Sequence, residues 1–519
     1  MMVSRRIAAV GGPFVAVATL LLLCASGALG TAAEGPVGLF DAHGDVGSPR
    51  IGGSAVYNAF SQDYALSAAG TNLWGTRDEF HYAWTRLTGD FILQASVDLV
   101  GKGVDPHRKL GWLVRQSLDA DSPYADGAVH GDGLTSLQFR RTKGGETAEL
   151  RAPLTGADVI QLERKGSRYT LSVARHGETF VQGEPLDLDL GDEVYAGLFL
   201  CSHNPEVVER AIFRNVRVVR PVRPGFTPYR DYIGSLLEVL DVETGRRQVI
   251  HQSAQPFEAP NWTPDGQALI VNTSGSTDSR GRLARFDLAT RQLSLVDTGF
   301  ARRNNNDHVL SFDGGTLGIS DQSTGDGQSV IFTLPSGGGT PKRITAEAPS
   351  YLHGFSPDGK FVVYAGGRGG EYDIYRMAVD GGGKELRLTN TPGLDDGPEY
   401  TPDGRFIYFN STRSGPMQIW RMKADGSEPE RVTNDGWNDW FPHVSPDGRF
   451  LAFVSFPKEV PAGDHPYYQR VYLRVMPIEG GTPKVVAYVY GGQGTMNVPS
   501  WSPDSKMLAF VSNSDLPRR

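Results

Sequence analysis

Short stretches of alternating apolar and polar residues run through the first two fifths of the chain. In residues 91–99, Phe91, Leu93, Ala95, Val97 and Leu99 fall on one face of an extended strand. Residues 159–162 and 169–173 flank a short turn at 165–167, which predicts a hairpin, and residues 211–219 form a further strand. The pattern predicts an antiparallel all-β sandwich over residues 36–220.

From residue 230 onward, the pattern becomes a repeat marked by a Pro-Asp-Gly turn after an apolar or aromatic residue. Its aspartates are spaced 48, 45, 45, 44 and 57 residues apart, and the second turn, residues 310–314, lacks the proline; they are Asp265, Asp313, Asp358, Asp403, Asp447 and Asp504. A period near 45 with several strands per unit is typical of a propeller blade. We expect these aspartates to be turn residues rather than site residues.

The number of blades follows from how the repeat ends. The sixth unit stops after its second strand, residues 508–512, and the two missing strands match residues 236–242 and 248–250 at the other end of the repeat. Joining them hides the open sheet edges. The sequence therefore predicts a six-bladed propeller over residues 234–519, closed by a blade split between both ends. The proline-rich segment 221–233 is predicted to be a stiff linker.

The first 33 residues are typical of a secretory signal peptide. Arg5 and Arg6 precede an uncharged apolar run from residue 7 to 23, and small residues follow. The alternative is an uncleaved membrane anchor, because the apolar run approaches spanning length. We expect a periplasmic or secreted protein that contacts a membrane only through this segment, if it is not cleaved.

The amino-acid composition and net charge exclude several classes of protein. The 64 glycines and 33 prolines suit short strands and tight turns rather than long helices. A formal charge of −8 argues against a general nucleic-acid binder, and two cysteines argue against a disulfide scaffold or a cysteine-based zinc module. The sequence contains no phosphate-binding glycine loop, serine elbow or HExxH pattern.

The repeat unit, a Ser/Thr-Pro-Asp-Gly turn, an apolar strand and an Ile-Tyr/Trp-Arg-Met strand, resembles the TolB-like six-bladed β-propeller family over residues 230–519. The resemblance implies a periplasmic protein–protein role, and related propellers include oligogalacturonate lyases. The N-terminal half resembles concanavalin A-like jelly rolls, which are common among carbohydrate-binding domains. That second resemblance rests on residues 72–74, 89–91, 111–112 and 130–133.

Four blades place an ionisable residue four or five positions before the turn aspartate, namely His308, His353, Glu399 and His443. Blade symmetry predicts that they converge at one mouth of the central channel. All four are candidate ligands of a divalent metal ion, the only cofactor that the sequence suggests. Alternatively, His353, Glu399 and His443 serve as catalytic acid and base. The structural alternative is that each histidine satisfies a neighbouring loop carbonyl.

Further candidates for ligand binding lie near the same face, which also carries a long insertion at residues 457–469. They are Glu258, Asn261, Arg303, Asn306, Asp396, Trp440, His465, Gln493 and Asn497. Amides, carboxylates and arginine suit a polar ligand, and tryptophan suits a sugar ring. The main hypothesis is a protein that binds a carbohydrate or a cell-envelope partner. The alternatives are a lyase-like enzyme acting on an acidic oligosaccharide, with metal or His/Glu catalysis, and a protein–protein scaffold of a Tol-type system.

Overall fold

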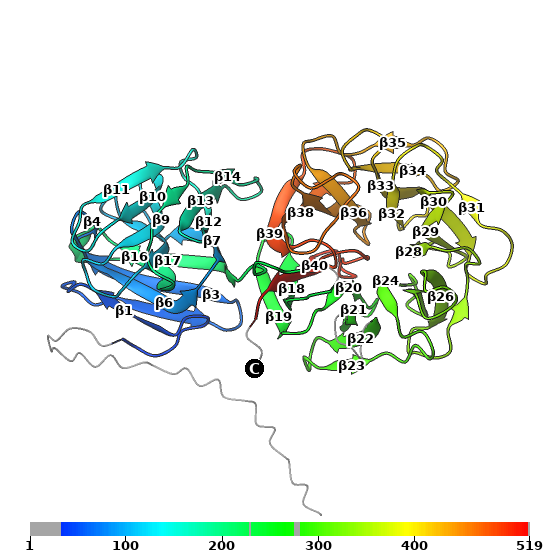
Figure 1. Cartoon of the computed structure of the whole chain (residues 1–519), viewed down its shortest axis with the longest axis horizontal. Coiled ribbons are helices and arrows are strands. Elements are labelled where there is room, and N and C mark those ends of the chain that lie inside the picture. Colours follow the sequence, from blue (N-terminus) through cyan, green and yellow to red (C-terminus); the bar gives the residue numbers. More distant parts are fainter. Residues whose placement is uncertain (1–32, 228–229, 274–280, 517–519) are drawn as a thin grey trace, which may run out of the picture.

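The computed structural model describes residues 33–227, 230–273 and 281–516, and every helix or strand within those ranges is a β-strand (Figure 1). The predicted signal peptide therefore lies almost entirely outside the described residues. Within them, no helix has the length and apolar character to cross a membrane.

The N-terminal unit consists of two antiparallel sheets. One has the order β1 (Ala42–Val46), β6 (Phe80–Thr88), β16 (Glu193–Cys201), β8 (Lys109–Arg115), β9 (Tyr124–His130), β10 (Thr135–Arg140) and β11 (Thr147–Arg151). The other has the order β14 (Val181–Gln182), β13 (Arg168–Ala174), β12 (Val159–Lys165), β7 (Phe91–Leu99), β17 (Asn204–Val219), β3 (Asp63–Gly70) and β2 (Ser54–Asn58), with β15 (Leu186–Asp187) on β13. A small hairpin pairs β4 (Leu73–Trp74) with β5 (Arg77–Asp78).

One apolar core joins the two sheets. Phe91, Leu93, Ala95 and Val97 of β7 point into it, as their alternation predicts, and meet Trp112 from the opposite sheet. The predicted hairpin is present as β12 and β13. The last strand is longer than predicted, because β17 continues back to residue 204 through irregular pairing. This two-sheet arrangement is all-β, while its identity as a jelly roll stays a prediction.

The second half of the chain is a six-bladed propeller (Figure 1). Five blades are complete four-stranded antiparallel sheets. In chain order they contain β20 (Glu258–Trp262), β21 (Ala268–Thr273), β22 (Arg282–Asp287) and β23 (Leu293–Leu295); β24 (Asn304–Leu310), β25 (Thr316–Asp321), β26 (Val330–Pro335) and β27 (Lys342–Arg343); β28 (Ser350–Phe355), β29 (Phe361–Arg368), β30 (Glu371–Ala378) and β31 (Leu386–Arg387); β32 (Asp395–Tyr400), β33 (Phe406–Ser411), β34 (Gln418–Lys423) and β35 (Glu430–Arg431); β36 (Asn438–Val444), β37 (Phe450–Phe456), β38 (Gln469–Pro477) and β39 (Lys484–Gly491).

The sixth sheet combines both ends of the propeller sequence. Strand β40 (Met507–Ser514) pairs with β18 (Gly234–Asp241), which pairs with β19 (Arg247–Ser253). In this register Leu236 lies opposite Ser512 and Leu240 opposite Leu508. These are the segments that the sequence assigns to the split blade.

The repeated turns have a common hydrogen-bond pattern. In the third blade, the Ser356 hydroxyl donates to Asp358 Oδ1 over 2.6 Å, and the Lys360 amide donates to the same oxygen over 3.1 Å. Gly359 follows with a φ of 69°, which favours glycine. A Ser or Thr hydroxyl donates to the turn aspartate in all six blades. These aspartates are therefore turn residues, as predicted.

The two units contact each other directly, although the sequence predicts only a stiff spacer between them. Val222 and Phe226 of the proline-rich segment pack against Tyr468 and Tyr490 of the propeller and against Ile92 of the N-terminal unit. The segment is therefore part of a shared apolar contact.

Candidate functional site

An irregularity in the first strand of each complete blade determines which way its side chains point. In β20, β24, β28, β32 and β36, the pairing with the second strand shifts register within the strand. Ala259, Gly397 and Phe441 lie at these bulges with φ values of 52°, 62° and 55°, and each precedes a proline. Such bulges redirect the side chains on either side of them.

The earlier residues of the first strands line a central pocket of about 650 Å³. The later residues line a second cavity of about 310 Å³, here called the distal pocket, at the other end of the same strands. Thus Glu258 and Asp396 face the central pocket, whereas Asn261 and Glu399, three positions further along, face the distal pocket.

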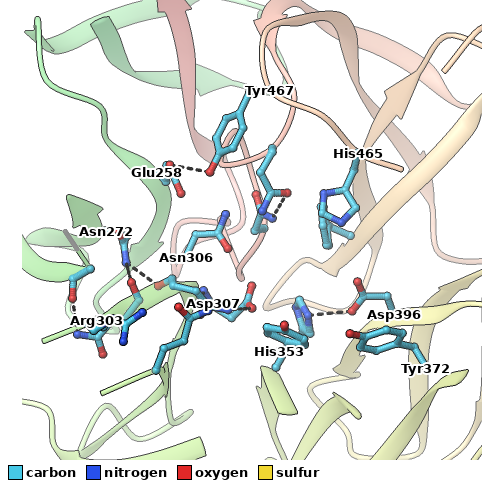
Figure 2. Close-up of a pocket in the computed structure, with 18 of the residues that line it drawn as sticks. Glu258, Asn272, Arg303, Asn306, Asp307, His353, Tyr372, Asp396, His465 and Tyr467 are labelled. Atoms are coloured by element: carbon cyan, nitrogen blue, oxygen red, sulfur yellow. Dashed lines mark hydrogen bonds and ion pairs between the residues drawn. The ribbon is translucent and has the colours of Figure 1, made fainter. Parts of the chain in front are cut away.

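Five blades place the same position of the repeat in the wall of the central pocket. This position is seven residues before the turn aspartate, and its occupants are Glu258, Asn306, Tyr351, Asp396 and Asn497. Figure 2 shows several of these side chains pointing toward one another from different blades. The blade repeat therefore produces a ring of carboxylates, amides and a phenol around one volume.

A charged group of three residues occupies one side of the pocket. His353 Nε2 lies 3.1 Å from Asp396 Oδ1, and Asp307 lies on the other side of the imidazole (Figure 2). Burial alone would lower the pKa of His353, but Asp307 and Asp396 outweigh it and raise the pKa to about 9. His353 is therefore a buried cation at neutral pH, and its ring stacks on Phe441.

The two carboxylates respond differently to this environment. Burial raises the pKa of Asp307 to about 6, although the charge of His353 opposes the shift. Burial also opposes ionisation of Asp396, yet the hydrogen bond from His353 prevails and lowers the pKa of Asp396. The pocket thus contains a tightly held ion pair beside a carboxyl group that titrates close to neutrality.

The insertion between β37 and β38 forms another part of the wall. It contributes Gly463, His465 and Tyr467, and the Tyr467 hydroxyl donates to Glu258 Oε1 over 3.0 Å. His465 packs edge-on against Trp440 at a ring separation of 4.4 Å. The insertion that the sequence places on the same face as the candidate residues therefore lines the pocket.

The remaining wall is rich in side-chain amides. The Asn272 amide donates to the backbone oxygens of Asn304 and Asn305, which positions the start of β24. Among the described residues, Asn306 Nδ2, Asn272 Oδ1 and Asn304 Oδ1 are buried without a hydrogen-bond partner. Buried polar atoms are normally paired with protein, water or ligand, so this wall favours polar contents.

The structure places seven of the nine predicted ligand-binding residues in the wall of the central pocket. They are Glu258, Arg303, Asn306, Asp396, His465, Gln493 and Asn497. Asn261 lines the distal pocket instead, and Trp440 is buried behind His465 and Phe441. Whether the seven bind a ligand stays a prediction.

The predicted convergence of His308, His353, Glu399 and His443 is wrong. Only His353 lines the central pocket, while Glu399 lines the distal pocket. His308 is fully buried, and its Nε2 donates to the Ile270 carbonyl over 3.1 Å. The bulges account for the difference, because His353 lies at the register shift of its strand, whereas His308, Glu399 and His443 come after the shift and pair with the second strand.

Glu399 and His443 form a separate buried pair. His443 Nδ1 lies 2.6 Å from Glu399 Oε2, and His443 Nε2 donates to the Met496 carbonyl over 3.1 Å. The other carboxylate oxygen accepts the Val444 amide. Each polar atom of the pair thus has a partner within the fold. This matches the alternative that the histidines satisfy neighbouring carbonyl groups rather than bind a ligand.

The predicted metal set does not fit a metal ion. Across residues 33–227, 230–273 and 281–516, no group of three or more His, Cys, Asp or Glu side chains is arranged to hold one.

Four aromatic residues of the central pocket wall are not among the candidates that the sequence suggests, namely Tyr232, Tyr351, Tyr372 and Phe441. Counting back seven residues from each turn aspartate would have found Tyr351.

The fold and pocket together define a six-bladed β-propeller with a polar central pocket. The TolB beta propeller domain matches residues 347–515. The uncharacterized protein Atu1656 of Agrobacterium fabrum is 48% identical over 278 residues, which cover 53% of this chain and 92% of that protein. The chain belongs to the TolB-like β-propeller family.

Two further relatives agree with this assignment. A solved structure of a candidate TolB from Agrobacterium tumefaciens is 46% identical with a TM-score of 0.52, covering 56% of this chain and all of its own. The Tol-Pal system protein TolB of Bordetella pertussis is 28% identical over 148 residues, or 28% of this chain and 32% of that protein. The chain thus spans about a third of that relative's length.

Proposed function

We propose that this TolB-like propeller is an envelope protein whose central pocket binds a small polyhydroxylated ligand of the carbohydrate class. The observation that carries the proposal is the ring of polar side chains supplied by one repeat position in five blades. The predicted signal peptide and the family support the envelope location.

The chemistry of the wall suits such a ligand. Side-chain amides both donate to and accept from the hydroxyl groups of a sugar, carboxylates accept from them, and the wall contains both kinds of group. Tyr351 and Tyr372, with ring centroids 6.3 Å apart, supply aromatic surface for the C–H face of a sugar ring. A volume of about 650 Å³ lies within the usual range for small-molecule sites.

The test is calorimetric titration of the purified protein with neutral monosaccharides and disaccharides and with uronic acids. We expect at least one sugar to bind, and Asn306→Ala to weaken that binding about tenfold through loss of hydrogen bonds worth about 1–1.5 kcal/mol. Gln267→Ala, in a turn outside this pocket, is the control and leaves the affinity unchanged. The absence of binding by every sugar tested would refute the proposal.

Turnover of an acidic sugar chain is the second candidate function. Asp307, with a pKa of about 6 beside the cationic His353, is suited to accept a proton near neutral pH. Arg303 at the pocket rim is suited to hold a carboxylate. New reducing ends or unsaturated products from oligouronides, lost in Asp307→Asn, would establish this function.

A further inference from the structure

The distal pocket has a different character from the central pocket. Its wall contains the prolines of four repeated turns together with five aromatic rings, those of Trp262, Phe312, Phe355, Tyr400 and Trp501. Its volume of about 310 Å³ is at the lower end of the range for binding sites. The cavity is therefore suited to a group the size of one large side chain.

Two polar side chains of this wall, Asn261 and Glu399, already have partners within the fold. Asn261 Oδ1 accepts the Leu310 amide over 2.9 Å, and its Nδ2 donates to the Pro499 carbonyl over 2.7 Å. Glu399 is paired with His443 and the Val444 amide. These two side chains therefore have no hydrogen-bonding capacity left for a polar ligand; among the described residues of this wall, Trp262 Nε1 is buried without a partner.

One turn departs from the repeat at the mouth of this pocket. Five turns have proline before the aspartate, whereas the second blade has Phe312 in that position. The Phe312 side chain lines the distal pocket and remains 46% exposed. Proline suits the turn, and an exposed aromatic ring beside an apolar cavity is typical of a protein-binding surface.

Two residues of the distal pocket wall, Pro264 and Phe312, are followed directly by the turn aspartates Asp265 and Asp313. In the third, fourth and fifth blades, the residue after the turn glycine is a cation that pairs with its own turn aspartate. The first two blades have Gln267 and Gly315 instead. Accordingly, neither Asp265 nor Asp313 forms an ion pair with any residue that the structure describes, although the hydrogen bond from Thr263 and, more weakly, the charge of Arg285 lower the pKa of Asp265.

We propose that the distal pocket is a docking site for a protein partner. The partner inserts one apolar or aromatic side chain into the cavity against Phe312, and an adjacent lysine or arginine meets the carboxylates of Asp265 and Asp313. These carboxylates disfavour anionic lipid headgroups, so the charge pattern fits a basic polypeptide segment rather than a membrane surface.

Three capped peptides test this proposal by saturation-transfer NMR with the full chain. Their sequences are Gly-Phe-Arg-Gly, Gly-Phe-Glu-Gly and Gly-Ala-Arg-Gly. We expect the Phe-Arg peptide to bind most tightly, because it alone supplies both the apolar anchor and the cation. Its affinity should fall with rising salt.

Variants assign the binding to this surface. Phe312→Pro restores the repeat and should weaken the Phe-Arg peptide about tenfold. Asp265→Asn with Asp313→Asn keeps the oxygen that caps each turn and should remove the preference for Arg over Glu. The matched controls are Asp358→Asn, in a turn that has its own cation, and Phe60→Ala, an exposed ring of the N-terminal unit; neither should change binding.

Three outcomes overturn the proposal. One is that the Phe-Arg peptide binds no better than the other two, and another is that its binding survives Phe312→Pro. The third is a concentration-dependent dimer in sedimentation that Phe312→Pro dissociates, since this would assign the surface to a second copy of the chain. None of these outcomes depends on sugar binding in the central pocket, so the two proposals fail separately.

Discussion

Three histidines lie in equivalent parts of the blades, but the residues that contact each of them differ, and so do their hydrogen bonds and pKa values. His353 lies between two carboxylates and is a cation, whereas burial lowers the pKa of His308 to about 4 and keeps it neutral. His443 is held by Glu399. The sequence locates all three and predicts polar loops around them. It does not reveal their charge, because each charge depends on residues from another strand or blade.

The charge of His353 makes stability depend on pH. Folding raises its pKa from 6.5 to about 9, so its stabilising contribution is complete below about pH 6.5 and is lost as the pH rises through about 9. We expect the difference in unfolding free energy between the wild type and His353→Gln to shrink by up to about 3 kcal/mol between pH 6 and pH 9.5. Urea unfolding at both pH values measures this, and an equal difference at the two would contradict it.

The strands and the repeat are predictable at the element scale, but the direction of each first-strand side chain is not. Period-two alternation locates the strands, and the Pro-Asp-Gly spacing locates the blades. A bulge then changes the register within the first strand, so counting residues back from the turn separates His353 from Glu399. The proline after each left-handed residue marks three of the five bulges.

The bulge in β32 predicts a sensitive glycine. Gly397 has a φ of 62°, and a Cβ atom there would lie 2.5 Å from Asn410 Oδ1. We expect Gly397→Ala to lower the unfolding free energy by about 1–2 kcal/mol or more, from backbone strain together with the close contact. Denaturant unfolding measures the change.

The equivalent bulge in β20 supplies the matched control. Ala259 already has a φ of 52°, so Ala259→Gly relieves strain but increases the freedom of the unfolded chain. These effects nearly cancel, and we expect a change of less than about 0.5 kcal/mol. If Gly397→Ala and Ala259→Gly lowered the unfolding free energy equally, the left-handed backbone conformation would not explain the need for glycine at position 397.

The two halves of the molecule are joined by more than their linker. Glu238 of β18 is fully buried and paired with Arg247 of the same blade and with Arg217 of the N-terminal unit. The Gln62 side-chain amide of the N-terminal unit also exchanges two 2.9 Å hydrogen bonds with the backbone of Val249 on β19. No pattern in the sequence pairs these distant residues, so the interface between the two units cannot be predicted from it.

The outer strand of the split blade is thereby capped. A free strand edge exposes backbone donors and acceptors, and Gln62 satisfies them as a neighbouring strand would. Asn215 does the same for the Arg247 amide and the Gly245 carbonyl. The N-terminal unit therefore stabilises the blade in which the two ends of the propeller sequence meet.

This coupling predicts a large effect from one interface arginine and a small effect from another. Although burial opposes ionisation of Glu238, Arg217 and Arg247 lower its pKa to about 2, so the carboxylate is charged inside the protein. We expect Arg217→Met to lower the unfolding free energy by about 3 kcal/mol, because it removes one partner from a buried charge. Arg470→Met removes an ion pair with Glu163 in which the arginine is 53% exposed, and should cost less than about 1 kcal/mol. Denaturant unfolding of both variants makes the comparison, and similar small losses would mean that the N-terminal unit contributes little to holding the split blade.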